Sequence, residues 1–216
     1  MEKKDFSAYV YADNAATTRL SETALEAMLP YLTTYYGNPS SLYSFSHESR
    51  KAISNARADV AAVLNADPAE IIFTSGGTES DNMAVVGAAK ANAAKGKHLI
   101  TTTIEHHALL HTMKQLEKEG YSVTYVPVDG EGTVDVEALK AAVRPDTTLI
   151  SVMMANNEVG TIQPIAEIGE FARSKGILFH TDAVQAAGHI PIDVKAMNVD
   201  MLSISGHKFH GPKGVG

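Results

Sequence analysis

Short apolar runs alternate with helical patterns along most of this chain, and this alternation restricts the fold more than any other feature of the sequence. The apolar runs, each typical of a strand, span 71–74, 98–103, 122–128, 148–155, 177–182 and 200–205. The helical patterns span 46–64, 78–94, 106–119, 136–143 and 164–175. Strands separated by helices of this length indicate βαβ units. The sequence therefore predicts an α/β fold with a mainly parallel sheet flanked by helices.

Two residues mark the ends of the last expected helix. Pro164 suits a first helical position, because that position needs no backbone N–H. Gly176 suits the left-handed residue that commonly follows the carboxyl end of a helix.

Two of the expected strands end beside an amine and a carboxylate. The apolar run 199–204 stops at Ser205, which places Lys208 on the loop just beyond the strand. The run 177–182 ends in Asp182. Open α/β sheets bind ligands at the edge where the carboxyl ends of their strands meet. A lysine that condenses with an aldehyde and an anion that keeps a pyridine ring protonated are what a pyridoxal phosphate site needs, so this pair predicts such a site.

A glycine-rich turn precedes one of the expected helices. The segment 74–80 reads Thr-Ser-Gly-Gly-Thr-Glu-Ser and follows an apolar run. Free amides at a helix N-terminus bind phosphate groups. Taken alone, the turn is more often a helix cap made by threonine, and a lysine beside glycine is usually a solvated loop residue. Three such features at successive strand ends together favour the cofactor site.

Seven ordered motifs cover nearly the whole chain. They are YADNAATT (11–18), GNPSS (37–41), TSGGTESDN (74–82), EH (105–106), NNEVG (156–160), DAVQ (182–185) and SGHKFHGPKG (205–214). In this order they resemble the NifS/IscS-type cysteine desulfurases, which are class V aminotransferase-like enzymes. The resemblance implies the large domain of a fold-type I pyridoxal phosphate-dependent transferase, with the small C-terminal domain missing.

The resemblance also implies a role for each matching residue. Lys208 would hold the cofactor covalently and later move protons, Asp182 would pair with the pyridine nitrogen, and Gln185 would bond the phenolic oxygen. His106 would stack on the ring face. The implied phosphate ligands are Gly77, Thr78, Ser205 and His207, and the implied substrate-binding residues are Asn14, Ala15 and Asn157, of which Asn157 also lies near an oxygen of the cofactor.

The implied activity is that of a pyridoxal phosphate-dependent cysteine desulfurase. Such an enzyme removes sulfur from L-cysteine to give L-alanine and a protein-bound persulfide, used for iron-sulfur cluster assembly or thiolation. The implied partners are L-cysteine, a sulfur-acceptor or scaffold protein, and a second copy in a homodimer. Two alternatives stay open. One is another fold-type I enzyme, such as a selenocysteine lyase or a small-amino-acid aminotransferase, and the other is a non-catalytic pyridoxal phosphate-binding remnant.

The chain departs from this pattern because it contains no cysteine. A desulfurase needs a thiolate to accept the sulfur. We therefore expect the N-terminal part of a longer enzyme, whose remaining C-terminal segment is a further partner. Residues 1–17 are expected to pack with the small domain. Residues 18–216 are expected to form the cofactor-binding large domain, incomplete at its C-terminal end.

Composition argues against several other classes of protein. The formal charge is -7 and the basic residues are scattered, which argues against nucleic-acid binding. No apolar run approaches the ~20 residues that span a bilayer, and the N-terminus lacks the apolar core of a signal peptide, so a cytoplasmic protein is expected. His107 and His111 have the spacing of a metal pair, but a zinc site needs three or four ligands, and a solvated helix face is the favoured interpretation.

Overall fold

A computed structural model describes residues 8–216, and five parallel strands within them form one sheet. The strands are β1 (His98–Thr102), β2 (Ser122–Val126), β3 (Thr147–Ser151), β4 (Leu178–Asp182) and β5 (Met201–Ser203). Their order across the sheet is β2-β1-β3-β4-β5, and every neighbouring pair is parallel. The predicted α/β fold with a parallel sheet is confirmed.

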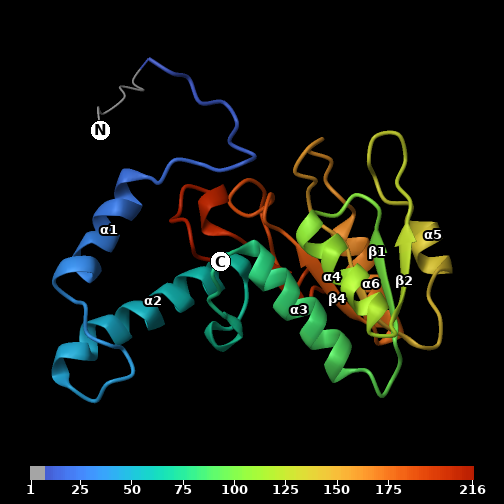
Figure 1. The fold of residues 1–216 in the computed structure, drawn as a ribbon, viewed down its shortest axis with the longest axis horizontal. Helices are drawn as coiled ribbons and strands as arrows, with labels where there is room; N and C mark the ends of the chain where they lie inside the picture. Colours follow the sequence, from blue (N-terminus) through green and yellow to red (C-terminus); the bar gives the residue numbers. More distant parts are fainter. Residues whose placement is uncertain (1–7) are drawn as a thin grey trace.

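Helices connect the strands and cover both faces of the sheet (Figure 1). The α-helices are α1 (Glu22–Thr33), α2 (His47–Leu64), α3 (Gly77–Ala91), α4 (His107–Lys118), α5 (Val136–Ala141) and α6 (Ile165–Lys175). Short 3-10 turns are η1 (Ser44–Ser46), η2 (Pro68–Glu70) and η3 (Gly206–Lys208). Among the described residues, no helix has both the length and the apolar character needed to cross a membrane.

The sheet is buried on both faces because alternate residues of each strand point to opposite sides. Ile100, Ile150 and Phe179 pack in one apolar cluster with residues of α5 and α6. Leu99 and Leu149 pack in a second cluster with residues of α3 and α4. The helices thus cover the faces of the sheet, and the loops at the carboxyl ends of the strands are left to form a site.

The predicted carboxyl end of α6 is confirmed, whereas its first residue differs from the prediction by one position. Gly176 follows the helix with φ of 67°, in the left-handed region, as predicted. Pro164 precedes the first helical residue instead of occupying that position, because its ψ of 60° lies outside the helical range.

The predicted strand at 148–155 is regular only as far as Ser151. Beyond it, the N–H of Val152 donates to the carbonyl of His180 at 3.1 Å, and the N–H of Met154 donates to the carbonyl of Asp182 at 2.8 Å. The segment therefore stays bonded to β4 while it leaves the regular strand. This course brings residues 152–157 beside the end of β4.

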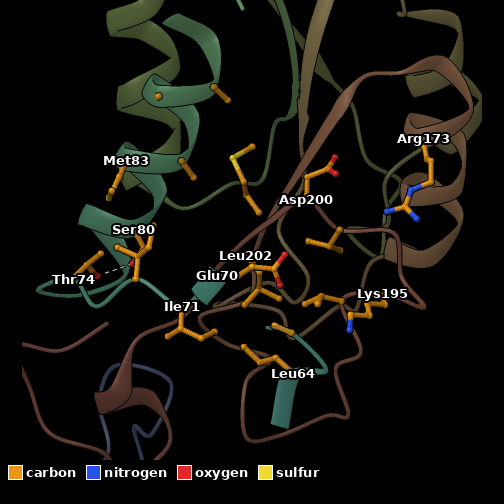
Figure 2. A pocket seen from close by; sticks show the side chains of 18 residues that line it. Leu64, Glu70, Ile71, Thr74, Ser80, Met83, Arg173, Lys195, Asp200 and Leu202 are labelled. Carbon is orange, nitrogen blue, oxygen red and sulfur yellow. Dashed lines mark hydrogen bonds between the residues drawn. The ribbon is translucent and has the colours of Figure 1, made fainter. Parts of the chain in front are cut away.

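The predicted strand at 71–74 is wrong. Ile71 is extended, but among the described residues the backbone of Thr74 bonds only to that of Gly216, at 2.8 and 2.9 Å in the two directions. A strand needs a continuous hydrogen-bonded neighbour. On the side facing β5, the structure instead has an apolar groove of about 660 Å³. Figure 2 shows Met83, Ile71 and Leu202 around this groove, which separates 71–74 from the outer edge of β5.

The described N-terminal residues are tied to the loop after β5. The backbone N–H and the hydroxyl of Thr18 both donate to the carbonyl of His207 at 2.8 Å. The N–H of Ser21 donates to the carbonyl of His210 at 3.0 Å. Of the segment predicted to pack with a small domain, residues 1–7 lie outside the described residues. α1 and α2 extend to one side of the sheet, blue and cyan in Figure 1.

Candidate active site

A cavity of about 270 Å³ lies at the carboxyl ends of the strands. All nine residues predicted to bind the cofactor line it: Gly77, Thr78, His106, Asn157, Asp182, Gln185, Ser205, His207 and Lys208. Its remaining lining residues are Ala16, Asp81, Met153 and Val184. Seven of these residues lie at or after the ends of β1, β3, β4 and β5, because parallel strands place their carboxyl ends at one edge. Gly77 and Thr78 instead begin α3. Of the residues predicted for the substrate alone, Ala15 and Asn14 do not line the cavity, and Asn14 is exposed.

The amine of Lys208 is held by the N-terminal segment. Its Nζ donates to the carbonyl of Ala15 at 2.5 Å and to that of Ala16 at 3.1 Å. Partial burial lowers the pKa of Lys208, against the opposing effects of Asp182 and Asp13. A lowered pKa increases the neutral fraction of the amine, which is its nucleophilic form.

Asp182 ends β4 and is 5% exposed. Burial raises the pKa of its carboxyl, whereas the N–H of Val184 and the charges of His106 and Lys208 lower it. The N–H of Val184 donates to Oδ1 at 2.9 Å. These groups favour the anion at Asp182 and oppose the effect of burial. Gln185, one turn further on, donates from Nε2 to the carbonyl of Ala15 at 2.8 Å.

His106 caps the start of α4. Its Nδ1 accepts a hydrogen bond from the N–H of Ala108 at 3.1 Å, so a neutral ring carries its proton on Nε2. His106 thereby takes a fixed position at the edge of the cavity.

The rings of His107 and His111 lie 5.5 Å apart further along the helix. Within residues 8–216 no three His, Cys, Asp or Glu side chains are grouped closely enough to hold a metal ion.

The start of α3 is open toward the cavity. Gly76 precedes the helix, and no side chain caps it, so the threonine-cap interpretation of the turn is wrong. A Cβ atom added to Gly77 would lie 2.7 Å from Cγ2 of Val184. Glycine at 77 therefore lets the helix start approach the residues that follow Asp182. The uncapped amides of the first turn can bind an anion there.

The profile of the Aminotransferase class-V family matches residues 10–216. The chain belongs to this family. It is 61% identical over 207 residues to the cysteine desulfurase IscS of Clostridium botulinum strain Hall, which covers 96% of this chain and 52% of the relative. It is 59% identical to the IscS of Methanosarcina thermophila, over 96% of this chain and 51% of that one. The chain thus spans about half the length of the curated relatives it matches.

Solved structures with the class V fold are similar in the same way. The chain superimposes on a NifS-like protein with a TM-score of 0.93 and 46% identity, covering 95% of this chain and 57% of the other. The structure titled SspA in complex with cysteine gives a TM-score of 0.92 and 43% identity, covering 95% and 59%. Enzymes of this family work with pyridoxal phosphate.

Two buried carboxyl groups of this class V chain were not predicted as site residues. Asp81 lies on α3 and lines the cavity, 1% exposed. Glu105 is fully enclosed, and burial raises its pKa to about 8. Its Oε1 accepts bonds from the hydroxyl of Thr102 at 2.7 Å and from the N–H of Met153 at 3.0 Å. Glu105 therefore ties the loop that carries His106 to the segment after β3. In the sequence, only its position one helical turn after Gly77 connects Asp81 with the predicted phosphate ligands.

Proposed function

We propose that this chain forms the cofactor-binding part of a pyridoxal phosphate-dependent cysteine desulfurase. The reaction converts L-cysteine and a thiol, R–SH, into L-alanine and a persulfide, R–S–SH. The observation that supports it most strongly is one cavity that holds an amine, a buried carboxylate and an open helix start, contributed by Lys208, Asp182 and α3. The identity to cysteine desulfurases named IscS supports the substrate.

The residues present fit the cofactor. Lys208 would bind its aldehyde carbon, Asp182 would face its ring nitrogen, and the first turn of α3 would bind its phosphate. Ser205 and His207 lie on the same wall of the cavity and would add donors to the phosphate. When bound, pyridoxal phosphate supplies an electron-accepting ring that stabilises negative charge on the substrate's Cα.

The side chains divide the remaining work. The amine of Lys208, once free, is the base placed to take and return the Cα proton, and its lowered pKa favours the neutral amine that can do so. Asp182 as an anion keeps a positive charge on the group facing it. Gln185, Asn157 and His106 would orient the ring and the substrate from the cavity walls.

The sulfur must be transferred to a thiol that residues 1–216 do not contain, because they include no cysteine. The accepting thiol then lies on another segment of the same enzyme or on a sulfur-acceptor or scaffold protein. Sulfur passed on in this way would serve iron-sulfur cluster assembly or thiolation. The same absence is the one observation that favours the non-catalytic remnant as a second candidate. A selenocysteine lyase or an aminotransferase would use the same cavity with a different substrate.

Two uncovered surfaces support the proposed partners. The groove between 71–74 and β5 has apolar walls and an unpaired strand edge, so an extended apolar segment of the remaining C-terminal part of the enzyme would fit there. Residues 18–216 would then be the large domain that this segment completes. α1 has no buried residue, and α1 and the turn after it expose apolar and aromatic side chains, which supports a homodimer interface. These are Leu25, Leu29, Tyr31 and Leu32 on the helix, and Tyr35 and Tyr36 after it.

The proposed reaction is tested by supplying residues 1–216 with pyridoxal phosphate and L-cysteine, with and without the remaining half of a relative. We expect alanine and persulfide only when both parts are present. Leu202→Lys, which places a charge in the groove, should prevent this complementation. The matched control is Leu42→Lys, since Leu42 is 96% exposed and lies outside the groove. Steady turnover by residues 1–216 without an added thiol would contradict the proposal.

His106 has two roles that variants can separate: it caps α4, and its ring is proposed to stack on the cofactor. His106→Asn keeps an acceptor for the cap but removes the ring, whereas His106→Ala removes both. We expect both variants to bind pyridoxal phosphate up to about tenfold more weakly, the size of one lost aromatic contact. Only His106→Ala should also lower the melting temperature. His111→Asn, on the exposed face of the same helix, is the control for affinity. Equal affinity in His106→Asn and the unmodified protein would exclude ring stacking.

A further inference from the structure

Asp81 lies beneath the proposed phosphate-binding turn. It follows Gly77 by four residues in α3, which is about one helical turn of 5.4 Å. Its side chain is buried, and it lines the same cavity as Asp182 and Lys208. A charge on Asp81 would therefore act directly on any phosphate bound at the start of α3.

Among the described residues, no charged base forms an ion pair with Asp81. Its Oδ1 lies 3.6 Å from Nε2 of His180, but burial lowers the pKa of His180 to about 3, so that ring is neutral. The two nitrogens of His180 instead contact the hydroxyls of Ser151 at 2.8 Å and Ser203 at 3.0 Å. Among the described residues, Oδ1 of Asp81 has no hydrogen-bond partner. An anion at Asp81 would therefore be buried with one of its two oxygens unpaired, which is costly.

The other groups around Asp81 favour an anion at Asp182 instead of at Asp81. Asp182 and His180 face it from β4, Glu105 faces it from the loop before α4, and Lys208 lies across the cavity. Asp182 has the N–H of Val184 and the charge of Lys208 to stabilise its anion, whereas Asp81 has only the hydroxyl of Ser203. Burial and the charge of Asp182 raise the pKa of Asp81 to about 8.

We propose that Asp81 is a neutral, protonated positioning residue in the working site, and that loss of its proton weakens phosphate binding at the start of α3. This rests on the proposed function, since it assigns the phosphate of the cofactor to that turn. Like charges about one helical turn apart repel by an amount worth on the order of 10²-fold in affinity at an effective dielectric constant of about 20. An anion at Asp81 would also attract the single positive charge of the cofactor ring. Its repulsion of the negative phosphate should exceed this attraction.

The first experiment measures the affinity of the intact protein for pyridoxal phosphate, and separately for inorganic phosphate, at about pH 7 and about pH 9, below and above the titration of Asp81 near 8. The ratio of the Asp81→Asn affinity to the unmodified affinity cancels the titration of the ligand. We expect this ratio to rise about tenfold over the interval, because pH 9 lies one unit above the titration of Asp81 and the bound protein can take the proton back. Asp59→Asn is the control, because Asp59 is exposed on α2, and its ratio should not change with pH.

A second experiment needs no bound ligand. Asp81 takes up a proton on folding between its ordinary pKa and about 8, so the folded state loses stability as pH rises through that range. Relative to Asp81→Asn, the folding equilibrium constant of the unmodified protein should fall by up to about tenfold per pH unit between about pH 5 and pH 7. Glu105 is present in both proteins, so its own titration cancels. Denaturant unfolding at several pH values measures this difference.

The outcomes separate this inference from the proposed function. Carbon-13 NMR of labelled aspartates in the unmodified protein should show Asp81 protonated at about pH 7, and this measurement does not depend on the folding of any variant. Titration of Asp81 below about pH 5, or a pH-independent affinity ratio, would overturn the inference while leaving the cofactor site intact. Failure to bind pyridoxal phosphate, with Asp81 still protonated and phosphate still bound, would instead remove the proposed function.

Discussion

Lys208→Ala is expected to lose the covalent attachment of pyridoxal phosphate and to reduce alanine release from L-cysteine by at least about 10³-fold. Lys208 is proposed to act both as the nucleophile that holds the cofactor and as the base at Cα, and positioned proton transfer alone contributes about 10²- to 10⁴-fold. Borohydride reduction of the unmodified protein followed by peptide mass spectrometry should find the cofactor on Lys208. The variant should carry no such label.

Lys213 provides the matched control for this experiment. It lies five residues after Lys208 on an exposed turn and does not line the cavity. Lys213→Ala should keep the cofactor label on Lys208, the yellow colour of bound pyridoxal phosphate and the activity. A label found on Lys213 in the unmodified protein would show that the wrong lysine has been assigned, whatever the activity of the variants.

Asp182→Asn is expected to reduce alanine release by about 10²-fold or more while pyridoxal phosphate still binds. Asparagine keeps the size and a hydrogen-bonding group but cannot be an anion, and loss of one electrostatic contact to the reacting centre costs about this much. The comparison of cofactor affinity with turnover number in the same variant distinguishes an electronic role from a positional one. Full turnover in Asp182→Asn would mean that the carboxyl serves only to accept the N–H of Val184.

The decline of activity at acidic pH should reflect protonation of the Asp182 carboxyl. Burial raises the pKa of Asp182 above its ordinary range, so the anion is lost at a higher pH than for an exposed aspartate. Activity is therefore expected to fall on acidification, beginning nearer to neutral pH than an ordinary aspartate would allow. In Asp182→Asn the residual activity should not show this decline. Asp59→Asn should retain the profile of the unmodified protein.

The sequence was sufficient to predict which residues meet at one edge of the sheet. Lys208, Asp182 and His106 each follow an apolar run, and parallel topology alone brings such positions to one edge of a sheet. The segment 71–74 was mispredicted because an apolar run does not establish that a strand has a neighbour. Asp81 was missed for a different reason. Its importance depends on the burial and neutrality of His180 on another element, which no local pattern in the sequence encodes.

The N-terminal segment shows the same limit. Its motif predicted Asn14 and Ala15 as substrate-binding residues, yet here the carbonyl of Ala15 accepts bonds from Lys208 and Gln185, and Asn14 is exposed. Backbone carbonyls are common to all residues, so a sequence cannot mark which of them will face a functional amine. The role of Asn14 stays a prediction.

The close approach of Gly77 to Val184 connects the two ends of the proposed ligand site. Gly77 begins the helix proposed to bind the phosphate, and Val184 closely follows the carboxylate proposed to face the ring nitrogen. Because a methyl group added at position 77 would lie 2.7 Å from Cγ2 of Val184, Gly77→Ala would have to displace the helix start or the Val184 side chain. The distance between the two ends of a bound ligand is therefore tied to the sizes of residues 77 and 184.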